Sequence, residues 1–254
     1  MRYVVLSFDD GRKDFYTNAF PVLRKYGLPA TLNVITDTLG REDPAHMTEA
    51  EVLECAAAGV EIACHSADHT NGAEQILRGA ERLEAMLKAP RGGVGFASPE
   101  SEICWRNFGS YAPLLREGRL LYIRSGNQVR RDGYLYAALY VLYRATKSKA
   151  LFRWYNRRNL IRVEKKPREY FYPSVTCNAE NSMGQVLSLL RKMPDNTAAV
   201  VMLHSVLPPE DPGREAGKWR SGTEEFEELC RYLAGEPGLR TVTNARLHGL
   251  LGGE

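Results

Sequence analysis

Residues 3–11 read YVVLSFDDG, a β-rich apolar run that ends in two carboxylates and a glycine. Runs of the same kind recur along the chain, and we expect each to form a strand. They lie at 30–35, 60–64, 93–97, 119–124, 170–175, 197–203 and 239–243. Polar side chains follow several of these runs directly. This first run therefore predicts the first strand of a sheet, with functional side chains at its carboxyl end.

Helical patterns lie between most of these runs. Residues 48–58 open with Thr48 as an N-cap and stop at Gly59, residues 73–88 place their apolar side chains on one face, and residues 223–234 repeat the theme. Alternating strands and helices over about 250 residues predict a parallel α/β fold. An open doubly wound sheet and a closed barrel of seven or eight strands both fit. No G-x-G-x-x-G or Walker loop follows the first strand, which weighs against a nucleotide-binding sheet.

Composition sets the broad class of the protein. The chain has 254 residues, is 44% hydrophobic and has a formal charge of +3, which suits an ordinary folded domain and does not argue for nucleic acid. Its five cysteines form no C-x-x-C pair, so we expect free thiols. The first apolar stretch is too short for a signal peptide. We therefore expect a cytoplasmic protein, which could act at the inner face of the membrane.

Residues 126–168 interrupt the alternation. Residues 130–168 hold twelve Lys and Arg against Asp132 and Glu164, together with seven Tyr, Phe and Trp. We expect a basic, aromatic helical insertion within one domain spanning residues 1–254. It could contact an anionic membrane surface peripherally. The alternative is a solvated insertion whose aromatic side chains pack on the rest of the protein.

Polar residues at three strand ends combine to predict a catalytic centre. Asp9 and Asp10 follow the first strand, His65 and His69 follow the third, and His204 follows the strand 197–203. In a parallel barrel the carboxyl ends of all strands open on one face, where active sites form. His65 and His69 are spaced i, i+4, which on a helical turn would let both imidazoles bind one ion. Asp10 would supply a carboxylate ligand, leaving Asp9 free as a base.

The same residues resemble a known family. Residues 7–11 (SFDDG) resemble the T-F-D-D-G signature of the polysaccharide deacetylases, the NodB-homology group known as carbohydrate esterase family 4. Residues 65–69 (HSADH) match its H-[ST]-x-x-H motif, and residues 201–204 (VMLH) resemble its L-x-L-H motif. The order agrees, and the likeness spans nearly the whole chain. The resemblance implies a distorted (β/α) barrel.

The resemblance also implies roles. Asp9 would be the general base, and His204 the acid that protonates the leaving group. Asp10, His65 and His69 would bind one divalent metal ion. Two histidines and a carboxylate suit zinc, with cobalt, nickel, manganese or iron as alternatives.

Two family motifs are incomplete. The third usually carries an arginine that orients the base, but here residues 95–100 read GFASPE, which keep only the proline, Pro99. The fourth motif, with its Asp and Trp, has no convincing match after residues 119–124. Arg124 stands there, as a candidate contact for the base or the substrate. Trp219 could stack on a sugar ring. We therefore expect Pro99, Arg124 and Trp219 on the substrate side of the site.

Three functions fit this pattern. The first is removal of acetyl groups from N-acetylated amino sugars in an oligosaccharide, a polysaccharide or a glycan precursor. The second is another amide hydrolase on the same scaffold. The third is a carbohydrate-binding relative that lost turnover. The presence of every proposed ligand favours catalysis. The sugar and the oligomeric state stay open.

Overall fold

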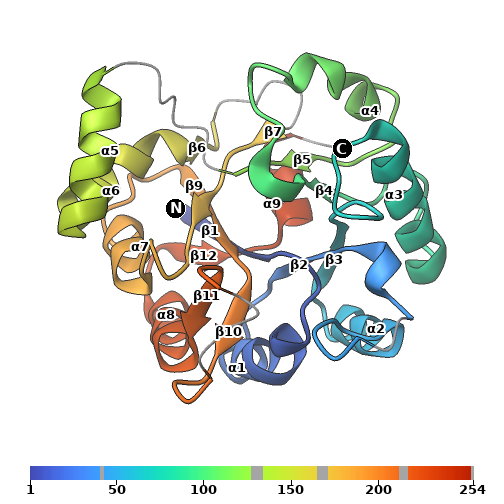
Figure 1. The fold of residues 1–254 in the computed structure, drawn as a ribbon, viewed down its shortest axis with the longest axis horizontal. Helices are drawn as coiled ribbons and strands as arrows, with labels where there is room; N and C mark the ends of the chain where they lie inside the picture. The colour runs from blue at the N-terminus through green and yellow to red at the C-terminus, as the bar shows by residue number, and fades with distance from the viewer. Residues whose placement is uncertain (41–42, 127–133, 165–170, 212–216, 253–254) are drawn as a thin grey trace.

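The structure is a computed structural model, and it describes residues 1–40, 43–126, 134–164, 171–211 and 217–252. Its centre is a parallel sheet curled into a barrel (Figure 1). Around the barrel the strands are β9 (Thr197–Leu203), β1 (Arg2–Phe8), β2 (Thr31–Val34), β3 (Glu61–Cys64), β4 (Phe96–Ala97), β5 (Ile123–Arg124) and β7 (Phe171–Tyr172). The predicted parallel α/β barrel is confirmed.

One stretch of chain nearly closes the barrel by pairing on both sides. β7 pairs with β5, and after two residues β8 (Val175–Thr176) pairs with β9 on the far side of the gap. Pro173 lies between the two halves, and proline cannot donate a hydrogen bond to a sheet ladder. The single strand expected at 170–175 is therefore split. This split strand makes the barrel distorted.

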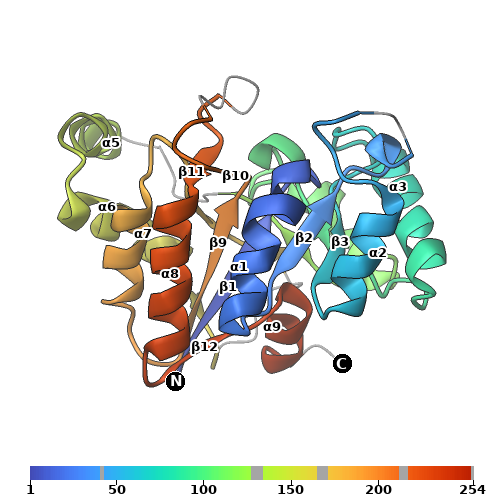
Figure 2. The ribbon, with the colours of Figure 1, turned by 90° about the horizontal axis from the view of Figure 1, so that it is seen from below.

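Helices cover the outside of the barrel (Figures 1 and 2). They include α1 (Phe20–Tyr26), α2 (Glu49–Ala57), α3 (Ala73–Leu87), α4 (Ala112–Arg116), α7 (Met183–Leu190) and α8 (Thr223–Gly235). Thr48 caps α2 as predicted, since its side chain accepts from the Glu51 backbone N–H while the Glu51 side chain accepts from the Thr48 N–H. A short strand pair lies outside the barrel, formed by β10 (Ser205–Leu207) and β11 (Arg220–Gly222).

The interior of the barrel changes from apolar to polar along its axis. Alternate residues of a strand point the same way, so Val5, Ser7 and Asp9 share the inward direction. At the amino ends of the strands, a buried apolar cluster joins the strands to α9 (Asn244–Leu250), which closes this end (Figure 2). Its members include Val5, Ala63, Tyr122, Tyr172, Val200 and Leu247. The polar side chains gather at the opposite end.

Two helices and a short strand follow β5 within the predicted insertion. They are α5 (Tyr134–Thr146), α6 (Lys149–Asn156) and β6 (Ile161–Arg162), which pairs antiparallel with β9. Tyr143 packs on Phe152 and Tyr155 of α6. Helices were expected here, but residues 127–133 and 165–168 of the predicted insertion lie outside the described residues. The insertion's boundaries therefore stay a prediction.

Two further features bear on the environment of the protein. All five cysteines are free, and Cys55, Cys64, Cys177 and Cys230 are buried. In the described parts of the chain, no helix combines the length and the apolar character that crossing a membrane requires.

Candidate active site

The predicted site residues meet at the carboxyl ends of the strands. Asp9 and Asp10 directly follow β1, His65 follows β3, and His204 follows β9. With His69, these residues line one small cavity. The barrel therefore brings together residues that are up to 195 positions apart in the chain.

Asp10, His65 and His69 form a cluster that could hold a metal ion. The Asp10 Oδ1 atom lies 3.3 Å from His65 Nε2 and 3.6 Å from His69 Nε2. Potential ligand atoms of the three side chains lie within 4.8 Å of one another. The Asp10 Oδ1 atom is buried without a hydrogen-bond partner among the described residues. An orphaned carboxylate oxygen facing two imidazole nitrogens fits a divalent cation.

Backbone hydrogen bonding orients one of these ligands. His65 is buried, and its Nδ1 lies 2.9 Å from the Ala97 carbonyl oxygen. Because a carbonyl can only accept, Nδ1 carries the proton and Nε2 presents its lone pair towards Asp10. Burial works against the imidazolium form, but the charges of Asp9 and Asp10 outweigh it and raise the pKa of His65. A metal ion at this cluster would therefore have to displace a proton at low pH.

The expectation that His65 and His69 share a helical turn is wrong. Residues 65–69 form no helix, and Ser66 and His69 have φ angles of 68° and 66°. These left-handed residues fold the chain back, and the rings lie with their centroids 5.0 Å apart. The first motif bends in the same way, because Asp10 has a φ of 76° and Gly11 a φ of 65°. Such conformations cost energy for non-glycine residues and cluster at functional sites.

Asp9 is bonded outside the cluster that Asp10, His65 and His69 form. It is buried, and its Oδ1 accepts from Arg124 Nη2 and, at 2.8 Å, from Asn33 Nδ2. Burial alone would raise the pKa of the Asp9 carboxyl, but Arg124 and the neighbouring histidines reverse this, so that the pKa falls below its usual value. Asp9 Oδ2 lies 3.9 Å from His204 Nε2. The carboxylate is therefore ionised and has one oxygen on the cavity side.

His204 packs against an aromatic ring, and no carboxylate among the described residues bonds to its Nδ1. That nitrogen is buried and has no hydrogen-bond partner in the described part of the chain. The Trp219 ring lies against the imidazole, with centroids 4.5 Å apart and planes inclined by 34°. Burial lowers the pKa of His204, although Asp9 and Asp10 partly oppose this shift. Among the described residues, none supplies the acid that the fourth family motif would place here.

The remaining predicted residues lie around this centre. Arg124 is fully buried against Asp9, and Trp219 lines the cavity. Pro99 is buried, and its carbonyl accepts from Asn71 Nδ2 at 3.0 Å. Its neighbours Ser98, Glu100 and Ser101 line the cavity.

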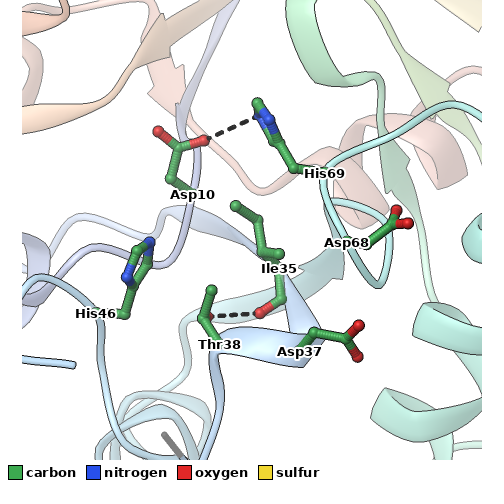
Figure 3. Close-up of a pocket in the computed structure, with 7 residues that line it drawn as sticks. All are labelled: Asp10, Ile35, Asp37, Thr38, His46, Asp68 and His69. Atoms are coloured by element: carbon green, nitrogen blue, oxygen red, sulfur yellow. Dashed lines mark hydrogen bonds and ion pairs between the residues drawn. The ribbon is translucent and has the colours of Figure 1, made fainter. Parts of the chain in front are cut away.

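Sequence reasoning missed two residues of this region. Asn33 was read only as part of a strand, although a buried amide inside an apolar run is itself a signal. His46 lines a second, larger cavity beside the cluster of Asp10, His65 and His69, together with Asp37, Thr38 and Asp68 (Figure 3). Its ring is held by Asp43, whose Oδ2 lies 2.6 Å from His46 Nδ1. The scarcity of histidine in the chain was the available clue to His46.

Known proteins are similar to part of the chain in sequence and to nearly all of it in fold. Residues 1–92 match the family model described as polysaccharide deacetylase. YxkH of Bacillus subtilis (strain 168), a protein assigned to the polysaccharide deacetylases, is 42% identical over 66 residues. That match covers 26% of this chain and only 23% of YxkH. The shared sequence therefore lies in one part of each protein.

Solved structures extend the likeness along the chain. A Mycobacterium smegmatis protein assigned to the polysaccharide deacetylases has a TM-score of 0.56 at 15% identity, covering 99% of this chain and 90% of that one. A family 4 acetyl xylan esterase from Clostridium thermocellum, solved with a cobalt ion, has a TM-score of 0.51 at 20% identity, covering 99% and 93%. At these identities the likeness concerns the fold. The chain is therefore similar to the polysaccharide deacetylases in sequence over residues 1–92, and it shares the fold of these solved structures over nearly its whole length.

Proposed function

We propose that the protein is a metal-dependent deacetylase that hydrolyses the acetamide group of N-acetylated amino sugars in an oligosaccharide, a polysaccharide or a glycan precursor. One observation carries the proposal: Asp9 and His204 face the same cavity as the Asp10, His65 and His69 cluster. A ligand set, a separate carboxylate and a separate imidazole are the groups that metal-assisted amide hydrolysis requires.

The cluster Asp10, His65 and His69 would hold the metal ion, with zinc as our first choice and cobalt, nickel, manganese or iron as alternatives. When bound, a divalent ion polarises the acetyl carbonyl and lowers the pKa of the attacking water. The protein's own residues handle the protons. Asp9 Oδ2 takes a proton as the water oxygen attacks the carbonyl carbon. His204 Nε2 gives a proton to the nitrogen as the C–N bond breaks, which yields acetate and a free amine.

Arg124 and Trp219 would support the two proton-transfer groups. Arg124 and Asn33 fix Asp9 Oδ1, which leaves Oδ2 for the water. Trp219 holds His204 by ring contact and could present its other parts to the sugar. This arrangement favours turnover over simple carbohydrate binding, because the base keeps an arginine partner despite the change in the third motif. Pro99 would act through the cavity-lining residues beside it.

The first experiment separates metal ligands from proton-transfer groups. The protein is stripped of metal, reloaded with zinc or cobalt, and assayed for acetate release from N-acetylated chitooligosaccharides. His65→Ala should lose both the ion and the activity. Asp9→Asn and His204→Ala should keep the ion and lose on the order of a hundredfold or more in rate. Elemental analysis gives the metal content.

His46→Ala is the matched control, because this histidine lies near the cluster but outside the ligand set. It should retain one ion per chain. Full metal content in His65→Ala would refute the ligand assignment. Turnover of simple amides without acetate release from any acetylated sugar would instead point to another amide hydrolase on this scaffold.

A further inference from the structure

Helix α5 presents an apolar face to solvent. Ala138, Val141, Leu142 and Ala145 are spaced i, i+3, i+4 and i+7, which puts them on one side of the helix. All four are exposed, and Val141 and Leu142 are 65% and 48% exposed. In a globular protein this spacing normally marks the buried side of a helix.

The helix already uses another side for packing. Tyr140 and Tyr143 contact Tyr155 of α6, with ring centroids 5.6 and 5.4 Å apart. On a helix these tyrosines point away from the exposed apolar face, because residues one or two positions apart diverge by about 100° or more. The exposed face is therefore additional to the one that anchors α5, and no described residue covers Val141 or Leu142 fully.

The segment around this face is strongly basic. Residues 134–164 contain seven Lys and Arg and one acidic residue, Glu164, whereas the whole chain has a net charge of +3. Helix α5 itself has no acidic residue. The basic residues are Arg144, Lys147, Lys149, Arg153, Arg157, Arg158 and Arg162. Lys147, Lys149 and Arg157, which follow α5 in the chain, are exposed.

The position of α5 relates this face to the active site. Figure 2 shows α5 at the edge of the molecule, at the same end as the carboxyl ends of β1, β2 and β9. The site opens at that end of the barrel. Helix α5 and the opening of the site therefore lie at the same end of the molecule.

We propose that the exposed face of α5 and the basic residues beside it dock the protein onto an anionic lipid surface. Apolar side chains flanked by lysines and arginines match an interface of acyl chains and negative headgroups. A water-soluble polyanion has no apolar surface against which Val141 and Leu142 could be buried. A second copy of the chain would bring two strongly basic segments together, and these would repel each other. The lipid surface is the occupant that satisfies both features.

The test is co-sedimentation of the full chain with vesicles of phosphatidylglycerol or of phosphatidylcholine, at low and at physiological salt. We expect at least tenfold more bound protein with phosphatidylglycerol, and weaker binding as salt increases. Val141→Asp with Leu142→Asp, and separately Lys149→Glu with Arg157→Glu, should each reduce this binding at least tenfold. Leu53→Asp is the matched control, because Leu53 is an exposed leucine on α2. This variant should bind the vesicles as the wild type does. Circular dichroism confirms that each variant is folded.

Three results would overturn the proposal. One is the absence of wild-type binding to phosphatidylglycerol at low salt. Another is unchanged binding by the Val141→Asp, Leu142→Asp variant when the charge variant fails, which would indicate a site for soluble polyanions. The third is a dimer in sedimentation velocity without vesicles that this same variant abolishes, which would assign the face to a second copy. None of these outcomes depends on deacetylase activity.

Discussion

At the scale of single residues, the proposed chemistry depends most on the ion pair between Arg124 and Asp9. Both side chains are buried, and Arg124 is completely shielded from solvent. Removing one partner of a buried ion pair leaves an uncompensated charge, which costs about 3–5 kcal/mol of folding free energy. The pair therefore couples the stability of the fold to the ionisation state of Asp9, the proposed general base.

Arg124→Met should lower the free energy of unfolding by about 3–5 kcal/mol and abolish acetate release, while metal content persists at low temperature. The double variant Asp9→Asn, Arg124→Met should regain much of that stability, because no charge is left unpaired. Denaturant unfolding of the four proteins in this cycle measures the coupling. Equal stability of Arg124→Met and wild type would mean that the ion pair is not formed.

Sequence reasoning found the residues of the site more readily than their partners. The site residues were recognisable because they belong to short motifs that directly follow expected strands. They are Asp9, Asp10, His65, His69 and His204. The partner of Asp9 was harder to find, since 115 positions separate it from Arg124 and only the closed barrel puts them side by side. The contact of Trp219 with His204 depends on the return of β11 beside β10, a pairing that no pattern in the sequence predicted.

At the scale of elements, helix α3 supports the loop that carries two of the proposed metal ligands. Gly79 lies where α3 approaches this loop, and a Cβ atom there would lie 2.8 Å from Cys64 Sγ and 2.8 Å from the Ser66 carbonyl carbon. The helix can approach so closely only because this position has no side chain. The position of residues 65–69 thus depends on Gly79. From the sequence alone, this glycine would be expected only to weaken the helix.

Gly79→Ala should therefore destabilise the protein by about 1–3 kcal/mol, although alanine favours helix. It should also weaken metal binding, because α3 or the loop must shift. Isothermal titration with zinc and thermal unfolding measure the two effects. Gly235→Ala on α8, where an added Cβ meets nothing within 4 Å, should be neutral or slightly stabilising. Tight zinc binding by Gly79→Ala would show that the loop holds its shape without α3.

The elements themselves were predictable where they are long. The expected strands at 3–8 and 197–203 are present almost unchanged, because each is a continuous apolar run buried on both sides. Others are shorter than expected, above all 93–97 and 119–124, which reduce to Phe96–Ala97 and Ile123–Arg124. Short parallel strands contribute few ladder hydrogen bonds, so their extent is set by the neighbouring strand and not by the local sequence.

At the scale of the whole molecule, the barrel has an apolar end closed by α9 and a polar end that holds the site. Leu247 of α9 is fully buried in the interior cluster. Leu247→Ala should lower the free energy of unfolding by about 2–5 kcal/mol, through lost burial and a cavity. Metal affinity measured well below the unfolding temperature should not change, because the proposed ligands lie at the opposite end.

Arg246→Ala is the control for this variant, since Arg246 is exposed on the same helix and its truncation should change stability by less than about 0.5 kcal/mol. Comparing zinc affinity and denaturant unfolding in both variants tests the separation of the two ends. A loss of zinc affinity in folded Leu247→Ala would show that the closed end and the site are coupled.

The four buried cysteines can report local unfolding, because each becomes reactive only when the structure around it opens. A thiol reacts as its thiolate, and burial raises the pKa of Cys55, Cys64, Cys177 and Cys230 to about 12. Each belongs to a different sector of the wall: α2, β3, the turn after β8, and α8. Alkylation of the native protein should begin at the partly exposed Cys104. The order in which the other four then acquire the label gives the order in which the sectors of the barrel open.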